Sequence, residues 1–439
     1  MNENLYMYSY QKGSIGLNTL AFEKYESEVR SYCRHFPTVF TKSKGAFFFD
    51  EDGNKYIDFF CGAGAVNYGH NNDYIKEKVL DYIANDGITH SLDMYTTAKR
   101  DFIEYFEEKV LKPRDLDYKI MFPGPTGTNA VEAALKLARK YTKRRTVWAL
   151  MGAFHGMTLG ALALTTDKAS RRGAGVPLDS NVVHIPAPYM FPELDTIKYM
   201  ETLLTDDHSG VEKPAAFVIE TIQAEGGIQV FDVEWLKRVR EFCTKHEILL
   251  IVDDIQVGCA RSGTFFSFER AGIKPDIFTL SKSIGGYGFP LALTLFKPEL
   301  DVFTPGEHNG TFRGNQIAFI TAKAGLEYML SHNIEAETRR KGEIEKEFIE
   351  KEILPLDSRI KMRGIGLIWG IDFSEIPVKG FADKVQDYAF AHKLIIEGAG
   401  RKNAVLKTMP PLVIEDETLL EGLGILRDAI KEVLKEENK

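Results

Sequence analysis

The stretch that decides the fold runs from Leu249 to Gly288 and reads LLIVDDIQVGCARSGTFFSFERAGIKPDIFTLSKSIGGYG. Its four leading apolar residues end at an acidic pair, Asp253 and Asp254, and residues 275–280 form a second apolar run that ends just before Lys282. Both runs are too short for helices and have the composition of buried strands. Because ligands bind at the carboxyl ends of parallel strands in an α/β sheet, we expect Asp253 and Lys282 at one ligand-binding edge.

An acid and an amine at the same crevice indicate a particular chemistry. A lysine amine forms a Schiff base with a carbonyl compound, and an aspartate keeps a pyridinium nitrogen protonated. Each residue alone is weak evidence, since a lysine after an apolar run is usually solvated and an aspartate at a strand end usually caps a turn or helix. The combination, followed by Gly285, Gly286 and Gly288, is more specific.

This combination resembles the signature of the class III pyridoxal-phosphate aminotransferases. In that family D-E-x-Q is followed by G-x-G-R-T-G and then by a lysine between small residues, and here DDIQ is followed by GCARSG and SKS. The resemblance implies that Lys282 holds pyridoxal 5'-phosphate as a Schiff base, that Asp253 contacts the ring nitrogen and that Gln256 hydrogen-bonds the ring hydroxyl. Asp254 is expected to be structural.

The composition sets broad limits on the class of protein. The chain has 439 residues and a mass of 49.5 kDa, too long for one small core, so we expect a large domain and a smaller one. A net charge of −8 gives no basic surface, so nucleic acid is not an expected partner. The cysteines are far apart and fit neither a disulfide framework nor a zinc site, so no metal is expected.

The sequence also indicates where the protein acts. The first residues, MNENLYMYSYQKGS, lack the charged-then-apolar pattern of a signal peptide. No run of about eighteen apolar residues is present, so we expect no association with a membrane. Together with the cysteine spacing, which fits a reduced compartment, this predicts a cytoplasmic protein.

A β-hairpin is expected near the N-terminus. Residues 46–60 contain two apolar runs on either side of Asp52-Gly53, a strong turn signal. The small residues at 61–65 then form a loop that either brings the backbone close to a ligand or is an ordinary tight turn. The family has a comparable hairpin and loop on the substrate side of its site.

Residues 122–129, FPGPTGTN, precede a helix predicted over 130–141, where apolar residues recur with helical periodicity. Backbone N–H groups at a helix N-terminus suit a phosphate dianion, although on spacing alone an ordinary N-cap is the commoner explanation. TGTNAVEAALKLAR is similar to the family's S-G-T-E-A-N-E-A-A-L-K-L-A-R, where this loop binds the cofactor phosphate. The resemblance therefore implies that Gly127 and Thr128 bind phosphate.

A strand predicted over 146–151 leads to Phe154, in the sequence GAFHGM. An aromatic ring at a strand end can stack on a planar ligand, although core burial is its commoner role. In the family the aromatic residue before H-G covers the cofactor ring, which implies that role for Phe154. Relatives that use ornithine or γ-aminobutyrate have an arginine where this chain has Met157, so a different residue must bind the substrate carboxylates.

Three residues are candidates for substrate contacts. ETIQAEGG, after a strand predicted over 215–219, resembles the family's E-P-I-Q-x-E-G-G, whose second acid pairs with a C-terminal arginine and swings away when a dicarboxylate enters. Glu225 matches that acid, but Lys407 stands at the arginine position, and a lysine cannot form the bidentate contact. A solvated loop acid is an equally common explanation for Glu225. Arg34 is a further candidate for binding a substrate carboxylate, with a surface arginine as the alternative.

A polar loop at 307–315, EHNGTFRGN, resembles the family's H-G-x-T-F-x-G-N. In the family this threonine reaches the phosphate site of the partner subunit. Thr311 therefore implies a homo-oligomer, at least a dimer with shared active sites. From its residues alone the segment is only a polar loop.

The resemblance implies an α/β protein of pyridoxal-phosphate fold type I, with a mainly parallel sheet in a large domain and a smaller α+β terminal domain. We expect an N-terminal segment of the small domain over 1–75, the large domain over 76–323 and the C-terminal small domain over 324–439. The last of these should contain strands within 360–373 and an amphipathic helix over 419–434.

The expected function is amino-group transfer between a small amino acid and a 2-oxo acid, with ping-pong kinetics. Other members of the family remain alternatives: an ω-aminotransferase of the ornithine or γ-aminobutyrate type, or an aminomutase that moves the amine within one substrate. A binding protein without catalytic activity is a more distant alternative. The presence of both Lys282 and Asp253 argues against it, because a binding module needs neither.

Overall fold

The computed structural model describes residues 19–172, 174, 178 and 181–437. The N-terminal residues on which the absence of a signal peptide was argued lie outside this set, and the segment expected over 1–75 is described from residue 19. None of the helices in the described residues combines the length and the apolar character needed to cross a lipid bilayer.

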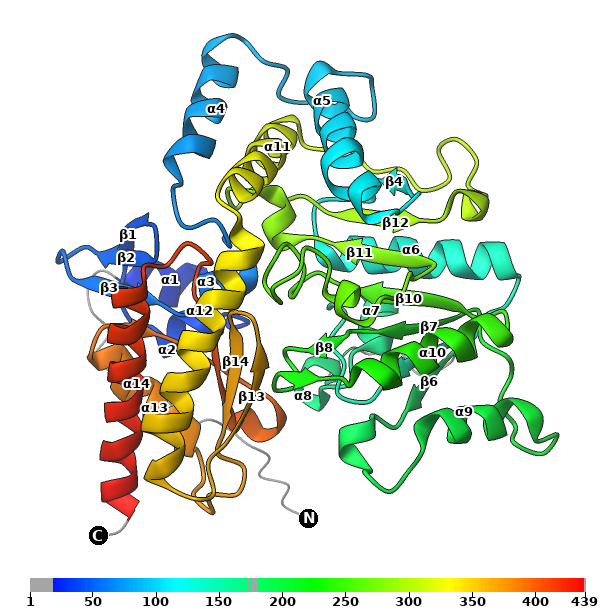
Figure 1. The fold of residues 1–439 in the computed structure, drawn as a ribbon. Helices are drawn as coiled ribbons and strands as arrows, with labels where there is room; N and C mark the ends of the chain where they lie inside the picture. Colours follow the sequence, from blue (N-terminus) through cyan, green and yellow to red (C-terminus); the bar gives the residue numbers. More distant parts are fainter. Residues whose placement is uncertain (1–18, 173, 175–177, 179–180, 438–439) are drawn as a thin grey trace.

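A seven-stranded sheet forms the centre of the molecule, with strand order β4-β12-β11-β10-β7-β5-β6 (Figure 1). The strands are β4 (Lys119–Met121), β5 (Val147–Leu150), β6 (Val182–Ile185), β7 (Ala216–Ile219), β10 (Leu249–Asp253), β11 (Ile277–Leu280) and β12 (Leu293–Phe296). All neighbours from β11 to β6 pair in parallel, and only β12 runs antiparallel to both of its neighbours. The predicted mainly parallel sheet is confirmed.

Helices cover both faces of this sheet, as continuous burial of its central strands requires. Val147 and Ala149 of β5 pack in one apolar cluster with α6 (Gly127–Thr142), while Trp148 packs in another with Phe242 of α10 (Val233–Lys245). Side chains alternate along a strand, so α6 and α10 lie on opposite faces. The predicted helix over 130–141 corresponds to α6, which begins three residues earlier.

The N-terminal hairpin has the predicted form. β2 (Phe47–Asp50) pairs antiparallel with β3 (Lys55–Asp58), and Gly53 in the turn has a φ of +82°. Residues 61–65, expected to be a loop, include a single helical turn, α3 (Cys61–Gly64), with left-handed φ at all four positions.

The two ends of the chain share one sheet. β15 (Leu394–Ile395) pairs in parallel with β3 and completes the order β1-β2-β3-β15, where β1 is Phe40–Lys44. A second small sheet has the order β13-β14-β17-β16, with β13 (Lys361–Ile365), β14 (Ile368–Asp372), β16 (Glu397–Ala399) and β17 (Val405–Thr408). The two-stranded hairpin of β8 (Ile222–Gln223) and β9 (Gln229–Val230) lies between the large sheet and these strands.

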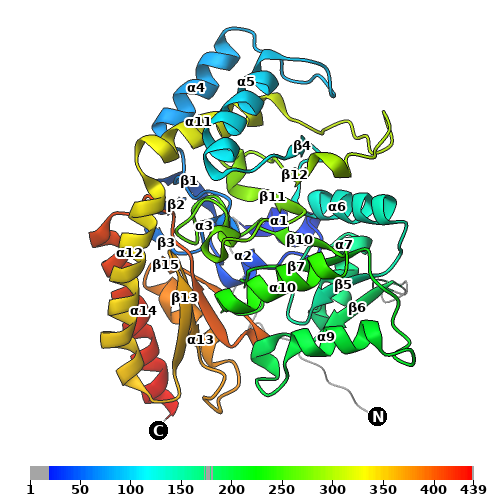
Figure 2. The same cartoon turned by 45° about the vertical axis from the view of Figure 1, so that its right-hand side comes forward.

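Long helices flank these smaller sheets. α12 (Ile334–Phe348) and α14 (Asp416–Glu437) lie side by side in both orientations (Figures 1 and 2). The predicted boundary between 323 and 324 falls inside α11 (Gln316–Ser331). The remaining helices are α1 (Leu20–Tyr25), α2 (Tyr32–His35), α4 (Asp73–Ala84), α5 (Thr97–Phe106), α7 (Leu159–Leu164), α8 (Lys168–Arg171), α9 (Thr196–Thr205) and α13 (Phe381–Ala391).

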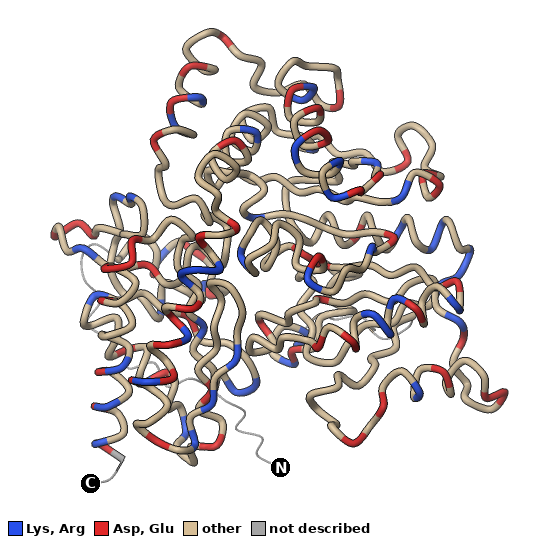
Figure 3. The backbone as a smooth tube through the Cα atoms, viewed as in Figure 1, with Lys and Arg blue, Asp and Glu red and all other residues tan. Residues whose placement is uncertain are grey.

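Acidic and basic residues are interspersed along the backbone, and no region of the trace is of one sign (Figure 3). The four cysteines are free, with Cys33 exposed and the other three buried.

Candidate active site

A cavity of about 330 Å³ lies where four neighbouring strands of the large sheet end. Phe154 follows β5, Glu220 follows β7, Asp253 ends β10 and Lys282 follows β11. The walls of the cavity are formed by Thr126, Gly127, Thr128, Phe154, His155, Gly156, Met157, Glu220, Ile222, Glu225, Asp253, Ile255, Gln256, Val257 and Lys282. The sheet thus brings most of the predicted site residues to one place, as the rule for parallel strand ends predicts.

Asp253 is buried, and both of its carboxyl oxygens contact other residues of the chain. Its Oδ2 lies 2.7 Å from Nδ1 of His155, and its Oδ1 accepts hydrogen bonds from the backbone of Ile255 and the hydroxyl of Thr279, both at 3.2 Å. Burial alone would lower the pKa of His155, but the hydrogen bond and charge of Asp253 outweigh burial and raise that pKa. Nε2 of His155 is buried and has no hydrogen-bond partner among the described residues.

Lys282 has a left-handed backbone, with a φ of +54°, a conformation that costs a non-glycine residue about 1–2 kcal/mol. The residues on either side hold it there. The hydroxyl of Ser281 donates to the carbonyl of Leu291 at 2.9 Å, and that of Ser283 donates to the carbonyl of Gly64 at 2.6 Å. Burial, reinforced by the charge of Lys407, lowers the pKa of Lys282, so that its amine more readily takes the unprotonated form that accepts a proton.

The N-terminus of α6 opens onto the cavity. Thr126 caps the helix, and the N–H groups of Gly127 and Thr128, the first two helical positions, have no acceptor within the described part of the chain. A Cβ on Gly156 would lie 2.5 Å from Oγ1 of Thr128, so glycine is required for this close approach. The free N–H groups and the helix dipole suit an anion.

Phe154, Glu220 and Gln256 complete the cavity wall. The backbone N–H of Phe154 donates to Oε1 of Glu220 at 3.0 Å. Burial raises the pKa of Glu220 to about 8, so this carboxyl group is largely protonated near neutral pH. The side-chain amide of Gln256 donates to the carbonyl of Ala63 at 3.0 Å, which ties the cavity to the segment after the N-terminal hairpin.

Glu225 and Lys407 form an ion pair of 2.6 Å at the edge of the cavity. Lys407 also lies 3.0 Å from a second carboxylate, that of Glu397. Burial by itself would raise the pKa of Glu225, but the ammonium groups of Lys407 and Lys282 lower it to about 2. The pKa of Glu397 is raised by burial despite Lys407, and both carboxylates raise the pKa of Lys407 against the effect of its burial.

Two predicted residues lie outside this cavity. Thr311 is exposed, and its carbonyl accepts a hydrogen bond from Nε2 of His90 at 3.0 Å. The guanidinium of Arg34, on α2, lies 2.5 Å from a carboxylate oxygen of Glu28 and does not line the cavity. The roles assigned to these two residues stay predictions.

Sequence reasoning assigned no role to His155, Glu220 or Glu397. His155 and Glu220 stand inside the motifs FHG and ETIQ, but the contact between His155 and Asp253 joins residues 98 positions apart. Glu397 has no motif of its own. Its position became visible only through the pairing of β16 with β17.

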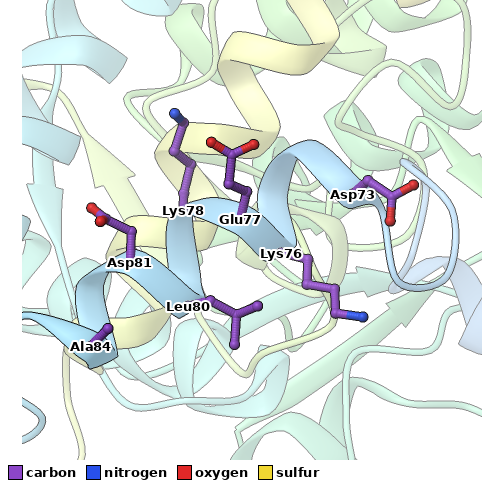
Figure 4. Close-up of a pocket in the computed structure, with 7 residues that line it drawn as sticks. All are labelled: Asp73, Lys76, Glu77, Lys78, Leu80, Asp81 and Ala84. Carbon is purple, nitrogen blue, oxygen red and sulfur yellow. The ribbon is translucent and has the colours of Figure 1, made fainter.

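A second hollow lies along α4. Figure 4 shows its seven lining residues, all from this one helix, with side chains that project to different sides. They do not converge on a point, so this hollow offers no candidate site.

The sequence profile of the family described as aminotransferase class-III matches residues 29–430. A diaminobutyrate–2-oxoglutarate transaminase of Halalkalibacterium halodurans is 53% identical over 416 residues, which is 94% of this chain and 96% of the relative. One of the same name from Nocardia farcinica is 54% identical over 424 residues, covering 95% of each chain.

Solved structures are similar across nearly the whole chain. A Bacillus anthracis aminotransferase superposes with a TM-score of 0.84 and 26% identity, covering 94% of this chain and 97% of that one. An ornithine aminotransferase from Toxoplasma gondii, described with pyridoxal phosphate partially occupying its active site, gives 0.84 and 24% identity over 96% of this chain and 95% of that one. At that identity the second likeness concerns the fold alone. The predicted fold class is confirmed.

Proposed function

The chain belongs to the class III aminotransferase family, and from that premise we propose its substrates. The enzyme transfers the amino group of L-glutamate to L-aspartate 4-semialdehyde and gives 2-oxoglutarate and L-2,4-diaminobutyrate, a product we assign to ectoine synthesis. The observation that carries this proposal is identity above one half, over nearly the full chain, to relatives named diaminobutyrate–2-oxoglutarate transaminase.

The residues of the cavity fit pyridoxal 5'-phosphate, the cofactor of this family. The unpaired N–H groups of Gly127 and Thr128 at the start of α6 suit its phosphate, and Asp253 is a buried carboxylate aligned by His155. We assign Phe154 to the face of the ring and Gln256 to the ring hydroxyl, with Lys282 as the covalent attachment point. When bound, the cofactor supplies an aldehyde that reacts with amines and a ring that accepts electron density.

The residues of this chain then perform the proton chemistry. Lys282, whose pKa is lowered by burial, takes the proton from the reacting carbon of the amino donor and, in the second half of the reaction, delivers a proton to the reacting carbon of the acceptor. Asp253 holds a proton on the ring nitrogen, and the contact from Nδ1 of His155 fixes the orientation of its carboxylate. The protonated form of Glu220 keeps an additional negative charge out of the cavity wall.

A homo-oligomer, at least a dimer with shared sites, is part of the proposal. The segment between α4 and α5 exposes Ile88, Leu92, Met94 and Tyr95, and Phe312 beside Thr311 is 66% exposed. The ring of Phe312 lies 5.5 Å from that of His90, so these apolar groups are adjacent. Apolar surface of this kind supports contact with a second copy, in which Thr311 would reach the partner's phosphate site.

The four free thiols support a cytoplasmic location.

Half-reactions of the purified holoenzyme test the substrate assignment. Absorbance of the cofactor is followed after separate addition of 2,4-diaminobutyrate, ornithine, γ-aminobutyrate and glutamate. Conversion by diaminobutyrate and glutamate, but not by ornithine, is the expected result. Faster conversion by ornithine or γ-aminobutyrate would place the enzyme among the other ω-aminotransferases, and turnover without a 2-oxo acid would identify an aminomutase.

A further inference from the structure

Lys407 is shared by two carboxylates that come from different parts of the fold. It lies on the internal strand β17, and Glu397 stands directly opposite it on β16 as its cross-strand partner. Glu225 approaches from the turn between β8 and β9. The ammonium nitrogen lies 2.6 Å from Glu225 and 3.0 Å from Glu397.

The cluster has an inner and an outer side. The side chain of Lys407 is 0% exposed and that of Glu397 is 11% exposed, whereas Glu225 is 30% exposed and lines the cavity. A molecule in the cavity therefore meets the carboxylate of Glu225 first and finds the lysine behind it. Lysine suits this arrangement, because its single nitrogen has three N–H donors that can point to separate acceptors.

One positive charge thus faces two carboxylates. Within the described part of the chain, Lys407 is the only residue with which Glu225 or Glu397 forms an ion pair. The other cation close enough to lower the pKa of Glu225 is Lys282, and its amine is committed to the cofactor. With both carboxylates ionised, the cluster has one negative charge in excess at the wall of the cavity.

We propose that this cluster of Glu225, Lys407 and Glu397 binds the ammonium group of a diamino substrate that does not react, and that Glu397 is the residue that sets the preference for diamino over monoamino substrates. The inference rests on the proposed function and says which group of the substrate the site recognises, namely the ammonium group that does not react. Without Glu397, Glu225 and Lys407 form a neutral pair, and the attraction for an ammonium group is lost. Glu397 is thus a positioning residue that acts through charge on Lys407 and Glu225.

The test compares two substrates that differ only in the α-amino group, 2,4-diaminobutyrate and 4-aminobutyrate. Half-reactions of the holoenzyme are measured at mildly alkaline pH, which favours ionised Glu397. In Glu397→Gln, we expect kcat/KM for diaminobutyrate to fall about ten-fold, mainly through KM, and that for 4-aminobutyrate to change less than about two-fold. Glu397→Asp, which keeps the charge, should retain most of the preference.

Binding of glutarate gives a readout without turnover. This five-carbon dicarboxylate has neither the amino group of glutamate nor the oxo group of 2-oxoglutarate, so it cannot react. Calorimetry measures its affinity for the holoenzyme. Removing a negative charge from the site should leave glutarate binding unchanged or strengthen it, in contrast to the loss for diaminobutyrate. The matched control is Glu375→Gln, which removes an exposed carboxylate 3.5 Å from Lys361 and should alter none of these values.

If Glu397 has only a structural role, Glu397→Gln should weaken the binding of diaminobutyrate, 4-aminobutyrate and glutarate together, and that result overturns the inference. An unchanged preference for diaminobutyrate over 4-aminobutyrate in Glu397→Gln also overturns it. If Glu397→Gln does not fold, Glu225→Gln removes the other excess charge and is judged by the same comparison. If wild-type enzyme fails to convert diaminobutyrate, the proposed function is wrong. The inference is then tested with ornithine and 5-aminovalerate, which also differ only in the α-amino group.

Discussion

At the scale of single residues, the site separates two buried acids by their surroundings. One carboxyl oxygen of Asp253 lies 2.7 Å from Nδ1 of His155, and the other accepts hydrogen bonds from the backbone of Ile255 and the hydroxyl of Thr279. Glu220 accepts one backbone hydrogen bond, and burial raises its pKa to about 8. The two acids thus have different surroundings in one cavity, and the roles that we propose for them differ accordingly: Asp253 contacts the ring nitrogen, and Glu220 is a largely neutral part of the cavity wall.

Replacing Asp253 by asparagine tests the first role. An amide cannot hold a proton on the ring nitrogen, so we expect kcat to fall about a thousand-fold, within the range typical for lost proton-transfer groups. Cofactor should still bind, because Gly127, Thr128 and Lys282 are unchanged. Steady-state kinetics and cofactor absorbance measure both effects, with Asp428→Asn on the exposed face of α14 as control. A loss of less than about ten-fold would remove Asp253 from the mechanism.

Replacing Glu220 by glutamine tests the second role through stability. The folded-state pKa of Glu220 is raised to about 8, so folding binds a proton, and wild-type stability falls as pH rises from the usual carboxyl value towards 8. Glutamine keeps the acceptor for the N–H of Phe154 and does not titrate, so at about pH 8 the variant should be more stable by about 4 kcal/mol.

Urea unfolding of both proteins across this pH range measures the difference. His155 contributes in the same direction in both proteins, since its raised pKa gives stability that is lost as pH rises through that value. The charge of Glu220 is a smaller cause of that raised pKa, so the difference between the two proteins reports Glu220 together with its interaction with His155. A constant difference between the two proteins at all pH values would contradict the assignment of a raised pKa.

At the scale of elements, the sequence predicted what depends on local pattern. The apolar runs before Asp253 and Lys282, the hairpin around Gly53 and the helical periodicity of α6 all correspond to observed elements. β12 received no prediction, and its antiparallel insertion between β4 and β11 follows from tertiary pairing. Cross-strand neighbours such as Glu397 and Lys407 could not be found for the same reason, because strand register is not encoded locally.

The junction between α6 and the turn at Gly156 gives a prediction at this scale. Gly156 has a φ of +131°, and an added Cβ would lie 2.5 Å from Oγ1 and 2.7 Å from Cβ of Thr128. Gly156→Ala should push the start of α6 away from the turn and weaken cofactor affinity about ten-fold, as loss of a well-placed helix N-terminus implies. Titration of the apoenzyme with pyridoxal phosphate measures the affinity.

Gly424→Ala is the matched control, because a Cβ at that position on α14 meets nothing within 4 Å. It should leave cofactor affinity unchanged and raise stability slightly through helix propensity. Equal cofactor affinity in Gly156→Ala and wild type would show that the close approach to Thr128 does not shape the phosphate site.

At the scale of the whole molecule, a buried arginine joins segments from the two ends and the middle of the chain. Nη1 of Arg261 donates to the carbonyls of Leu367 and Pro410 at 2.9 Å and 2.5 Å, and Nη2 donates to Asn67 at 2.6 Å. The motif containing Arg261 was visible in the sequence, but its partners were not, since they lie more than a hundred positions away. These hydrogen bonds therefore join the segment after β10 of the large sheet to the residues just before β14 and just after β17 of the smaller sheet.

The exposed apolar segment between α4 and α5 gives the last prediction, which concerns assembly. Tyr95 is 100% exposed and Met94 is 62% exposed, at the end of the molecule where α4, α5 and α11 lie (Figure 1). Charges there would be desolvated in a contact with a second copy, so Met94→Asp combined with Tyr95→Asp should lower the mass measured by sedimentation to that of one chain. Cofactor affinity should fall as well, because Thr311 of a partner would no longer complete the phosphate site.

Leu420→Asp, at an exposed apolar position of α14, is the control and should change neither the mass nor the cofactor affinity. A double variant that keeps the wild-type mass would place the interface elsewhere, and a monomeric variant with full cofactor affinity would separate assembly from the role proposed for Thr311.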